Sequence, residues 1–413
     1  MDQWSQTHTG NFNNWHPVVH TLFIMFLRHI WDSPAIVGVT QIIIMSLIFG
    51  YCMFQFEKVG AKKSVLWIIS LLFAISPVNG IYSITLWKDV FYSTFILLFS
   101  TVVLSLVVTN GDWLNCNRNM FIFLIASLGV VFFRHNGFPV FIAMAIVLLI
   151  VFRHRFKRFA FLSSLVVVIH YIVTGPIFDY LKVVPSDPNE ALSIPTQQLA
   201  NVIVNDGKIT DEQAKYLNEI LPLPLWKQYY RPYTTDNIKF SHEYNRKAIF
   251  PDHISTYLRT WMDICLQNPR LVTEAFIKQT SLVWQINPPT TNYHTLTYMT
   301  IIFHNPFGIK SRIIFDPLTI AVKKYLTISD TTLKPLIWRP ATYTLLILLF
   351  TFVAFLRNDW KAWLVPLTVL LNTGTVLIAL PAQDFRYLYS NSLVFFIAFL
   401  FAFISYKKKE MST

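Results

Sequence analysis

Long apolar runs separated by short polar connections make up most of the chain. A bilayer core of about 30 Å requires roughly 17–25 apolar residues per helix. The runs that approach this length are Ile36–Phe54, Val65–Ile84, Phe91–Thr109, Met120–Phe133, Phe138–Phe152, Phe159–Phe178, Ala341–Leu356, Trp363–Leu380 and Leu388–Tyr406. The pattern predicts an all-α, polytopic integral membrane protein with about nine transmembrane helices.

Some apolar segments fit the bilayer less simply. Met120–Phe133 and Phe138–Phe152 are short and are separated only by Arg134–Gly137, which predicts a tight helical hairpin with charged ends at the interface. Pro17–Trp31 is interrupted by histidine and arginine side chains. It therefore predicts an amphipathic helix on the membrane surface, with Pro17 at its first position.

The longest stretch without a spanning run, Asp179–Pro340, has helix signals of its own. Thr210 and Gln213 match a capping box. Periodicity predicts further helices over Asp252–Gln267, Arg270–Gln285 and Ile313–Tyr325, the last of them amphipathic. The chain is thus expected to divide into a membrane module (1–178), a helical extracytoplasmic segment (179–340) and a three-span module (341–413).

Basic residues fall in every second connection and so predict the orientation. They are Lys58, Lys62, Lys63, Arg118, Arg153, Arg155, Lys157, Arg158, Arg357, Lys361, Lys407, Lys408 and Lys409. Short connections rich in Lys and Arg stay in the cytoplasm. We therefore expect a multi-pass protein of the cytoplasmic membrane whose C-terminus is cytoplasmic and whose segment 179–340 is outside.

Composition supports this class and removes one alternative. The chain is 54% hydrophobic and 14% charged, whereas soluble domains carry about 25% charged residues. Its net charge of +12 needs no nucleic-acid partner, because membrane proteins retain Lys and Arg on their cytoplasmic side. The three cysteines form no CxxC, and no Walker or GxGxxG motif occurs.

The polar opening, Met1–His20, is neither a signal peptide nor a span, because it lacks a basic start and an early apolar core. We interpret it as an outer loop that carries an active-site acid, Asp2. The competing interpretation is a carboxylate in a frayed terminus. An outer loop at the start of the chain implies either that a preceding helix is missing, which we expect, or that the N-terminus is exported unaided.

The short connections predicted to lie outside, where cations should be rare, hold one cation each: Lys88, Arg134 and Arg386. Each one alone fits an ordinary cation at a helix end. Together with their polar neighbours they predict a site for a phosphate or diphosphate. The polar residues that we expect to contact substrate are Gln3, His16, Asp89, His135, Asn136, Gln197, Gln198, Asp384 and Tyr387.

A metal site is weakly indicated at most. His16 and His20 have the i, i+4 spacing of helical metal ligands, but Pro17 places His16 outside the helix and no third ligand is signalled. We predict no metal ligands, and the cofactor stays unknown. A divalent cation such as Mg²⁺ or Mn²⁺ is compatible with the sequence without being indicated by it.

Several short patterns, in this order, resemble the GT-C superfamily of integral-membrane glycosyltransferases, and more closely a bacterial branch of it. They are DQW…GNFNNWHPVVHT (Asp2–Thr21), LWKDVFYS (Leu86–Ser93), FRHNG (Phe133–Gly137), SIPTQQLANVI (Ser193–Ile203) and DFRYLY (Asp384–Tyr389). The resemblance implies that Asp2 acts at the acceptor, as a base or through a metal. It also implies a polyprenyl-phosphate sugar donor whose phosphate lies near Lys88, Arg134 and Arg386.

The expected activity is therefore transfer of a sugar, of the inverting type, to a cell-envelope glycan or lipid acceptor on the outer face. Two alternatives stay open: a transporter or flippase of an anionic lipid-linked glycan, and a non-catalytic member of the fold. Transport usually requires ionisable residues near the membrane midplane and repeat symmetry. His170 is one of few such candidates here, and no internal repeat is found.

Overall fold

The computed structural model describes residues 2–291, 296–299, 302, 304–310, 313 and 315–406. These residues form helices and connecting segments, with isolated β-bridges but no β-strand. They group into two compact units. The first comprises Met1–Ser186, Tyr298–Thr375 and Arg386–Thr413, and the second comprises Asp187–Thr297 and Val376–Phe385.

The first unit holds the long apolar helices together with the polar helix α1 and several short helices. They are α1 (Asp2–Thr9), α2 (Val18–Ile30), α3 (Ala35–Val59), α4 (Lys63–Ile75), α5 (Pro77–Tyr82), α6 (Lys88–Val108), α7 (Asn117–Phe132), α8 (Gly137–Val151), α9 (Phe156–Ile172), α10 (Phe178–Tyr180), α17 (Asp316–Asp330), α18 (Lys334–Ile337), α19 (Pro340–Arg357), α20 (Leu364–Ala379, whose end lies in the second unit) and α21 (Tyr389–Ala402). A π-helical turn, Val173–Ile177, joins α9 to α10.

Within the described ranges, six helical segments are long and apolar enough to cross a membrane: Ala35–Val59, Lys88–Val108, Arg153–Tyr180, Pro340–Arg357, Trp360–Ala379 and Phe385–Ala402. The chain is therefore a helical membrane protein. Shorter apolar helices occur at Val18–Ile30, Lys63–Ile75, Asn117–Phe132 and Gly137–Val151, so a total of nine spans stays a prediction. The span predicted over Val65–Ile84 is two helices in the structure: α4 ends at Ile75 and α5 begins at Pro77. The break falls at Pro77 because proline has no backbone N–H to continue the hydrogen bonds of α4.

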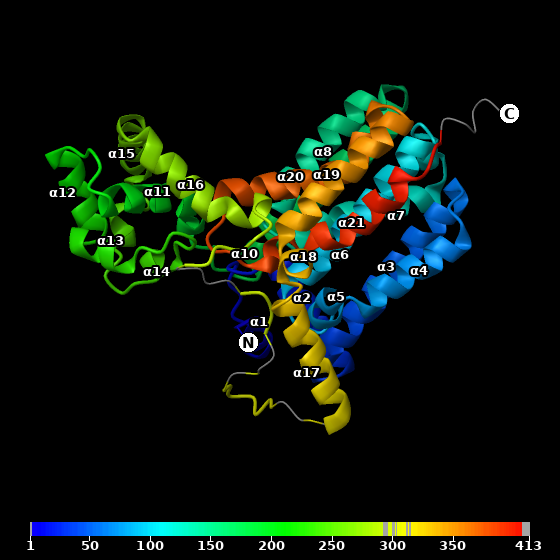
Figure 1. Cartoon of the computed structure of the whole chain (residues 1–413), viewed down its shortest axis with the longest axis horizontal. Coiled ribbons are helices and arrows are strands. Elements are labelled where there is room, and N and C mark those ends of the chain that lie inside the picture. The colour runs from blue at the N-terminus through cyan, green and yellow to red at the C-terminus, as the bar shows by residue number, and fades with distance from the viewer. Residues whose placement is uncertain are drawn as a thin grey trace. The chain divides into compact units, whose positions relative to one another are not determined.

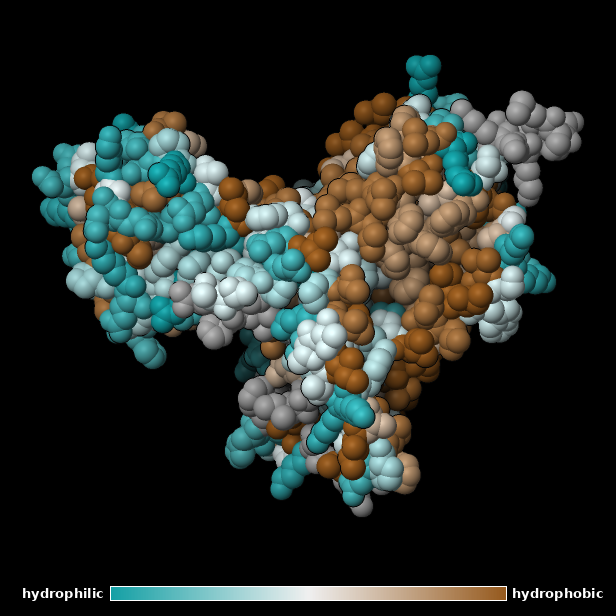
Figure 2. Space-filling model, viewed as in Figure 1, coloured by the Kyte–Doolittle hydropathy of each residue, from teal (hydrophilic) through white to brown (hydrophobic). Residues whose placement is uncertain are grey.

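α6 is the centre of the first unit. It contacts α3, α7 and α21, and α21 in turn contacts α19 (Figure 1). Most side chains of α6 are buried, polar Ser93, Thr94 and Thr101 included. Hydrophobic side chains gather on the outside of the apolar helices (Figure 2). Leu47 of α3 and Trp67 of α4 are exposed, as expected for side chains that face lipid.

The second unit is a small helical domain with its own core. Its helices are α11 (Ser193–Val204), α12 (Asp211–Ile220), α13 (Leu223–Tyr229), α14 (Asp236–Lys239), α15 (Ile254–Gln267) and α16 (Pro269–Trp284). Trp226, Tyr257 and Leu199 are buried among them. The predicted capping box at Thr210 is confirmed, since its hydroxyl accepts from the Gln213 amide and Gln213 bonds back.

The predicted boundary at residue 340 differs from the division found here. Residues after Tyr298 belong with the first unit, and α17 has its C-terminal turns against the α4–α5 break, where the Tyr325 hydroxyl donates to the Ile75 carbonyl at 2.8 Å. The predicted amphipathic helix Ile313–Tyr325 overlaps α17, although Ile314 lies outside the described residues, as do Lys407–Lys409.

Gly137 permits the tight turn between α7 and α8, and this leads to a first prediction. A Cβ at this position would lie 1.8 Å from the Val130 carbonyl oxygen, whereas a Cβ at Gly50 in α3 would meet nothing within 4 Å. Gly137→Ala should therefore destabilise the protein by about 1–3 kcal/mol. Gly50→Ala should be neutral or slightly stabilising. Thermal unfolding in detergent measures both, and equal melting temperatures would contradict the packing described.

Candidate functional site

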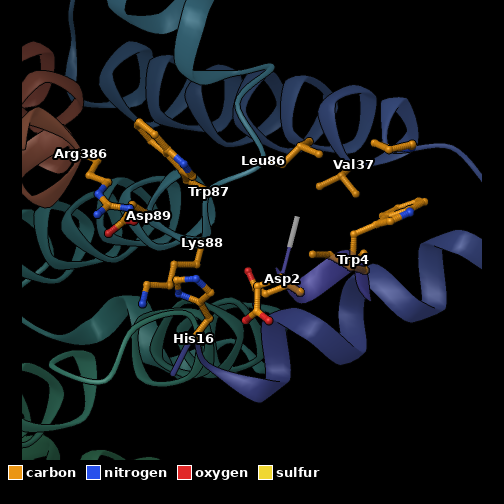
Figure 3. Close-up of a pocket in the computed structure, with 12 residues that line it drawn as sticks. Asp2, Trp4, His16, Val37, Leu86, Trp87, Lys88, Asp89 and Arg386 are labelled. Atoms are coloured by element: carbon orange, nitrogen blue, oxygen red, sulfur yellow. The ribbon is translucent and has the colours of Figure 1, made fainter. Parts of the chain in front are cut away.

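A cavity of about 230 Å³ lies in the first unit, with chemically different sides. Polar and charged residues line one part: Asp2, Gln3, His16, Lys88, Asp89 and Arg386. Apolar and aromatic residues line the other: Trp4, Ile24, Pro34, Val37, Leu86 and Trp87. Figure 3 shows Arg386 and Asp89 at one end and Val37 and Trp4 at the other, with Asp2 between them.

The N-terminal segment reaches this cavity as a packed helix, so its prediction as a loop was wrong. Trp4 in α1 is buried against Ile24, Val37 and Phe91. The polar composition of the segment hides this face, although the spacing of Gln3, Trp4 and Thr7 could have revealed it. Asp2 stands in the first turn of α1, where a carboxylate is favourable, and is exposed.

Polar bonds hold α1 on α2. The Gln3 amide donates to the Thr21 hydroxyl at 2.9 Å, and its oxygen lies 3.0 Å from His20 Nδ1. Gln3 therefore fixes α1 on α2 and also lines the cavity, and its predicted substrate contact stays a prediction. Gln6 donates to Asp2 Oδ2 at 2.8 Å and orients that carboxylate.

Lys88 and Arg386 both line the cavity, as predicted for the anion site. Lys88 is the first residue of α6 and follows Trp87. The Arg386 guanidinium lies 5.2 Å from the Trp87 ring and 5.1 Å from the Tyr387 ring. Arg386 also donates to the Tyr387 hydroxyl at 3.3 Å. Tyr387 and Trp87 therefore restrict how this cation can point.

Arg134 has a different environment from the one predicted. Its Nε lies 3.5 Å from Asp89 Oδ1, and both side chains are largely buried. Its Nη1 donates to the Tyr387 carbonyl at 2.8 Å. Arg134 and Asp89 therefore neutralise each other, which indicates that Arg134 supports the site. Asp89 also lines the cavity, and the substrate-binding roles of both residues stay predictions.

His16 contributes a neutral imidazole to the cavity. Burial, together with the nearby charges of Lys88 and Arg386, lowers its pKa to about 3, against the opposing effect of Asp89. Its ring can therefore accept or donate a hydrogen bond at neutral pH without adding charge. Its predicted substrate contact stays a prediction.

The remaining predicted residues are not part of this cavity lining. His135 is exposed beside the backbone of Asn14 and Trp15. Asn136 donates to Asn372 and Thr375.

Gln197, Gln198 and Asp384 belong to the second unit. Gln197 donates to the Arg231 carbonyl there, and Gln198 donates to the Val272 carbonyl and accepts from Trp261. These bonds help to hold the second unit together, and the substrate roles of the two glutamines stay predictions. Asp384 is buried and its backbone N–H donates to the Ala382 carbonyl.

In the part of the chain that the structure describes, no group of three or more His, Cys, Asp or Glu side chains is arranged to hold a metal ion. His16 lies before α2, and His20 lies within it, turned toward Gln3. The apolar wall of the cavity was missed from sequence, although Trp87 beside Lys88-Asp89 was a usable signal.

The fold and the cavity define a class: a helical membrane protein with a cavity that is cationic on one side and apolar on the other. Comparison with known families identifies the chain further. It belongs to the Family of unknown function (DUF6020), whose model matches residues 3–413. No curated protein and no solved structure matches the chain.

The Asp89–Arg134 pair gives a second prediction. Asp89→Asn leaves the buried Arg134 without its counter-ion, which typically costs about 3–5 kcal/mol. Asp32→Asn is the matched control, because Asp32 pairs with Arg28 at 2.8 Å but is 64% exposed, and exposed pairs contribute at most about 1 kcal/mol. Unfolding in detergent should separate the two variants clearly; similar losses would mean that Asp89 and Arg134 do not depend on each other.

His16 gives a third prediction, on pH. The folded imidazole has a pKa of about 3, below the usual 6.5, so the unfolded chain binds a proton more readily as the pH falls below 6.5. Stability should therefore decrease from about pH 6.5 downward, by up to about 1.4 kcal/mol per pH unit from this group. His16→Gln should flatten that slope between pH 6 and pH 4 in thermal-unfolding measurements. An unchanged slope would show that His16 is not buried in the neutral form.

Proposed function

We propose that the protein is a GT-C-type membrane glycosyltransferase. It transfers a sugar from a polyprenyl-phosphate-linked donor to a cell-envelope glycan or lipid acceptor on the outer face of a bacterial cytoplasmic membrane. The observation that carries the proposal is the two-sided cavity: Lys88 and Arg386 on one side, Ile24, Val37 and Leu86 on the other. Such a lining suits an amphiphile with an anionic headgroup.

The donor is assigned to this cavity by its chemistry. Its phosphate binds Lys88 and Arg386, since charge-assisted hydrogen bonds to phosphate are strong and arginine offers a planar fork. The first part of its lipid chain packs against Val37 and Leu86. Nucleotide sugars are not available outside the membrane, which favours a lipid-carried donor for an outer-facing enzyme.

The reaction is written as a single displacement. An acceptor hydroxyl oxygen attacks the anomeric carbon while the bond from that carbon to the phosphate oxygen breaks. Asp2 takes the hydroxyl proton, and the lipid phosphate leaves with a negative charge that Lys88 and Arg386 stabilise. Displacement from the opposite side inverts the anomeric configuration. The exposed position of Asp2 at the cavity leaves room for an acceptor.

The orientation is part of the proposal. Asp2, Lys88 and Arg386 come from three segments that the distribution of Lys and Arg assigns to the outer side. All three line one cavity, which supports a single active face outside the membrane and a cytoplasmic C-terminus.

A fourth prediction tests the proposal. Membranes that contain the protein should transfer label from polyprenyl-phosphate sugars to an envelope acceptor. Asp2→Asn should reduce the rate about 10²–10⁴-fold, the usual contribution of general-base catalysis. Arg386→Ala should reduce it about 10²-fold or more, because a charge that stabilises the leaving phosphate is lost. Asp32→Asn, an exposed ion-pair residue, is the control for expression and handling.

The outcomes separate the alternatives. Transfer that persists at the wild-type rate in both site variants, with expression equal to that of the control, would contradict the proposed roles. Movement of the lipid-linked sugar across the bilayer without transfer would instead indicate a flippase. Neither binding nor transfer nor movement would indicate a non-catalytic member of the fold.

A further inference from the structure

A buried asparagine in α20, Asn372, contacts three separate segments of the first unit. Its side chain is fully buried. Its Oδ1 accepts from the Tyr92 hydroxyl at 3.0 Å and from Asn136 Nδ2 at 3.0 Å. Its Nδ2 donates to the Ser390 hydroxyl at 3.2 Å. One amide thus uses both of its ends and bonds to side chains from α6, from the α7–α8 turn and from α21.

Each of these three partners stands close in sequence to one of the outer-side cations. Tyr92 follows Lys88 by four residues, which is one turn of α6. Asn136 follows Arg134 by two residues, and Ser390 follows Arg386 by four. The segments that carry Lys88, Arg134 and Arg386 are therefore tied to the same amide.

Further contacts make the arrangement a closed network. The Arg134 guanidinium lies 5.6 Å from the ring of Tyr92, so Tyr92 contacts both a cation and Asn372. Thr375 accepts from Asn136 Nδ2 at 2.6 Å and donates to the Asn372 carbonyl at 2.7 Å. Asn136 is therefore fixed by two neighbouring residues of α20.

Electrostatic repulsion explains why the three segments need hydrogen bonds that hold them together. Like charges on neighbouring segments repel each other, and the Asp89 carboxylate beside Arg134 offsets part of this repulsion. A neutral hydrogen-bond network can hold the three segments together without cancelling the positive charge. Breaking such a hydrogen bond inside a membrane bundle is costly, because no water is present to form a hydrogen bond with the polar group that loses its partner.

The geometry points to Asn372 as the residue that positions the three cation-bearing segments, and so sets the spacing of the anion site. The nature of the anion, a lipid phosphate, rests on the proposed function. The positioning itself does not, because it concerns contacts inside the first unit.

The chain offers a matched control in Asn391 of α21. It is as buried as Asn372, and its Nδ2 donates to Thr344 at 2.9 Å and to Thr373 at 3.0 Å. These partners belong to α19 and α20 and are remote in sequence from the three cations. Asn391 contacts the network by accepting a long hydrogen bond from the Ser390 hydroxyl at 3.3 Å. Asn372→Leu and Asn391→Leu therefore remove similar groups with different consequences.

The experiment uses the full chain in lipid nanodiscs and two readouts. Hydrogen exchange is followed over residues 86–92, 133–137 and 385–390. Binding of a polyprenyl monophosphate is followed by tryptophan fluorescence, since Trp87 lines the cavity. Asn372→Leu should speed exchange in all three segments and weaken binding about tenfold or more, as small misplacements of binding groups do. Asn391→Leu should change neither by more than about twofold.

A smaller substitution tests the same inference in case Asn372→Leu does not fold. Tyr92→Phe keeps the ring beside Arg134 and removes one bond to Asn372, so it should speed exchange over residues 86–92 most strongly. Equal exchange in Asn372→Leu and Asn391→Leu, or faster exchange in Asn372→Leu outside the three segments only, would overturn the inference. The expected exchange pattern in a protein that does not bind the phosphate lipid would support the positioning and contradict the proposed function.

Discussion

The contact on which the cavity depends is the buried ion pair between Asp89 and Arg134. Two charges removed from water are tolerated only when they meet, and Arg134 satisfies a second need by donating to the Tyr387 carbonyl. The pair thereby joins the first turn of α6 to the residue beside Arg386. Lys88 directly precedes Asp89 and Arg386 directly precedes Tyr387, and both Lys88 and Arg386 line the cavity.

The second requirement is an apolar anchor for the N-terminal helix. Trp4 packs into the cluster of Ile24, Leu27, Val37 and Phe91, which fixes α1 although most of its residues are polar. Burial of Trp4 fixes the position of α1, and this places Asp2, two residues earlier, at the cavity. Trp4, Ile24 and Val37 of this cluster also line the cavity, so one packing feature supplies both the carboxylate and part of the surface for a lipid chain.

The sequence predicted what depends on local patterns. The spans at α3, α6 and α19 were placed within a few residues, and the capping box at Thr210 was found, because periodicity and caps are local. The cations Lys88 and Arg386 were predicted together through the orientation rule. What was missed depends on tertiary contacts. The sequence of α1 is mostly polar, and its buried face becomes evident only from the packing of Trp4. Gln197 and Gln198 form hydrogen bonds inside the second unit. The hydrogen bond from Tyr92 to Asn372 joins residues 280 positions apart, and no local sequence pattern indicates it.

The most direct test is to find where a lipid phosphate binds. A photoreactive polyprenyl phosphate, with its reactive group near the phosphate, would be cross-linked to the protein in membranes, and the labelled peptides would be sequenced. The account predicts label on the segments around Lys88 and Arg386, which line the charged side of the cavity, and loss of that label when unmodified polyprenyl phosphate competes. Label confined to other segments, or label that the competitor does not reduce, would contradict it.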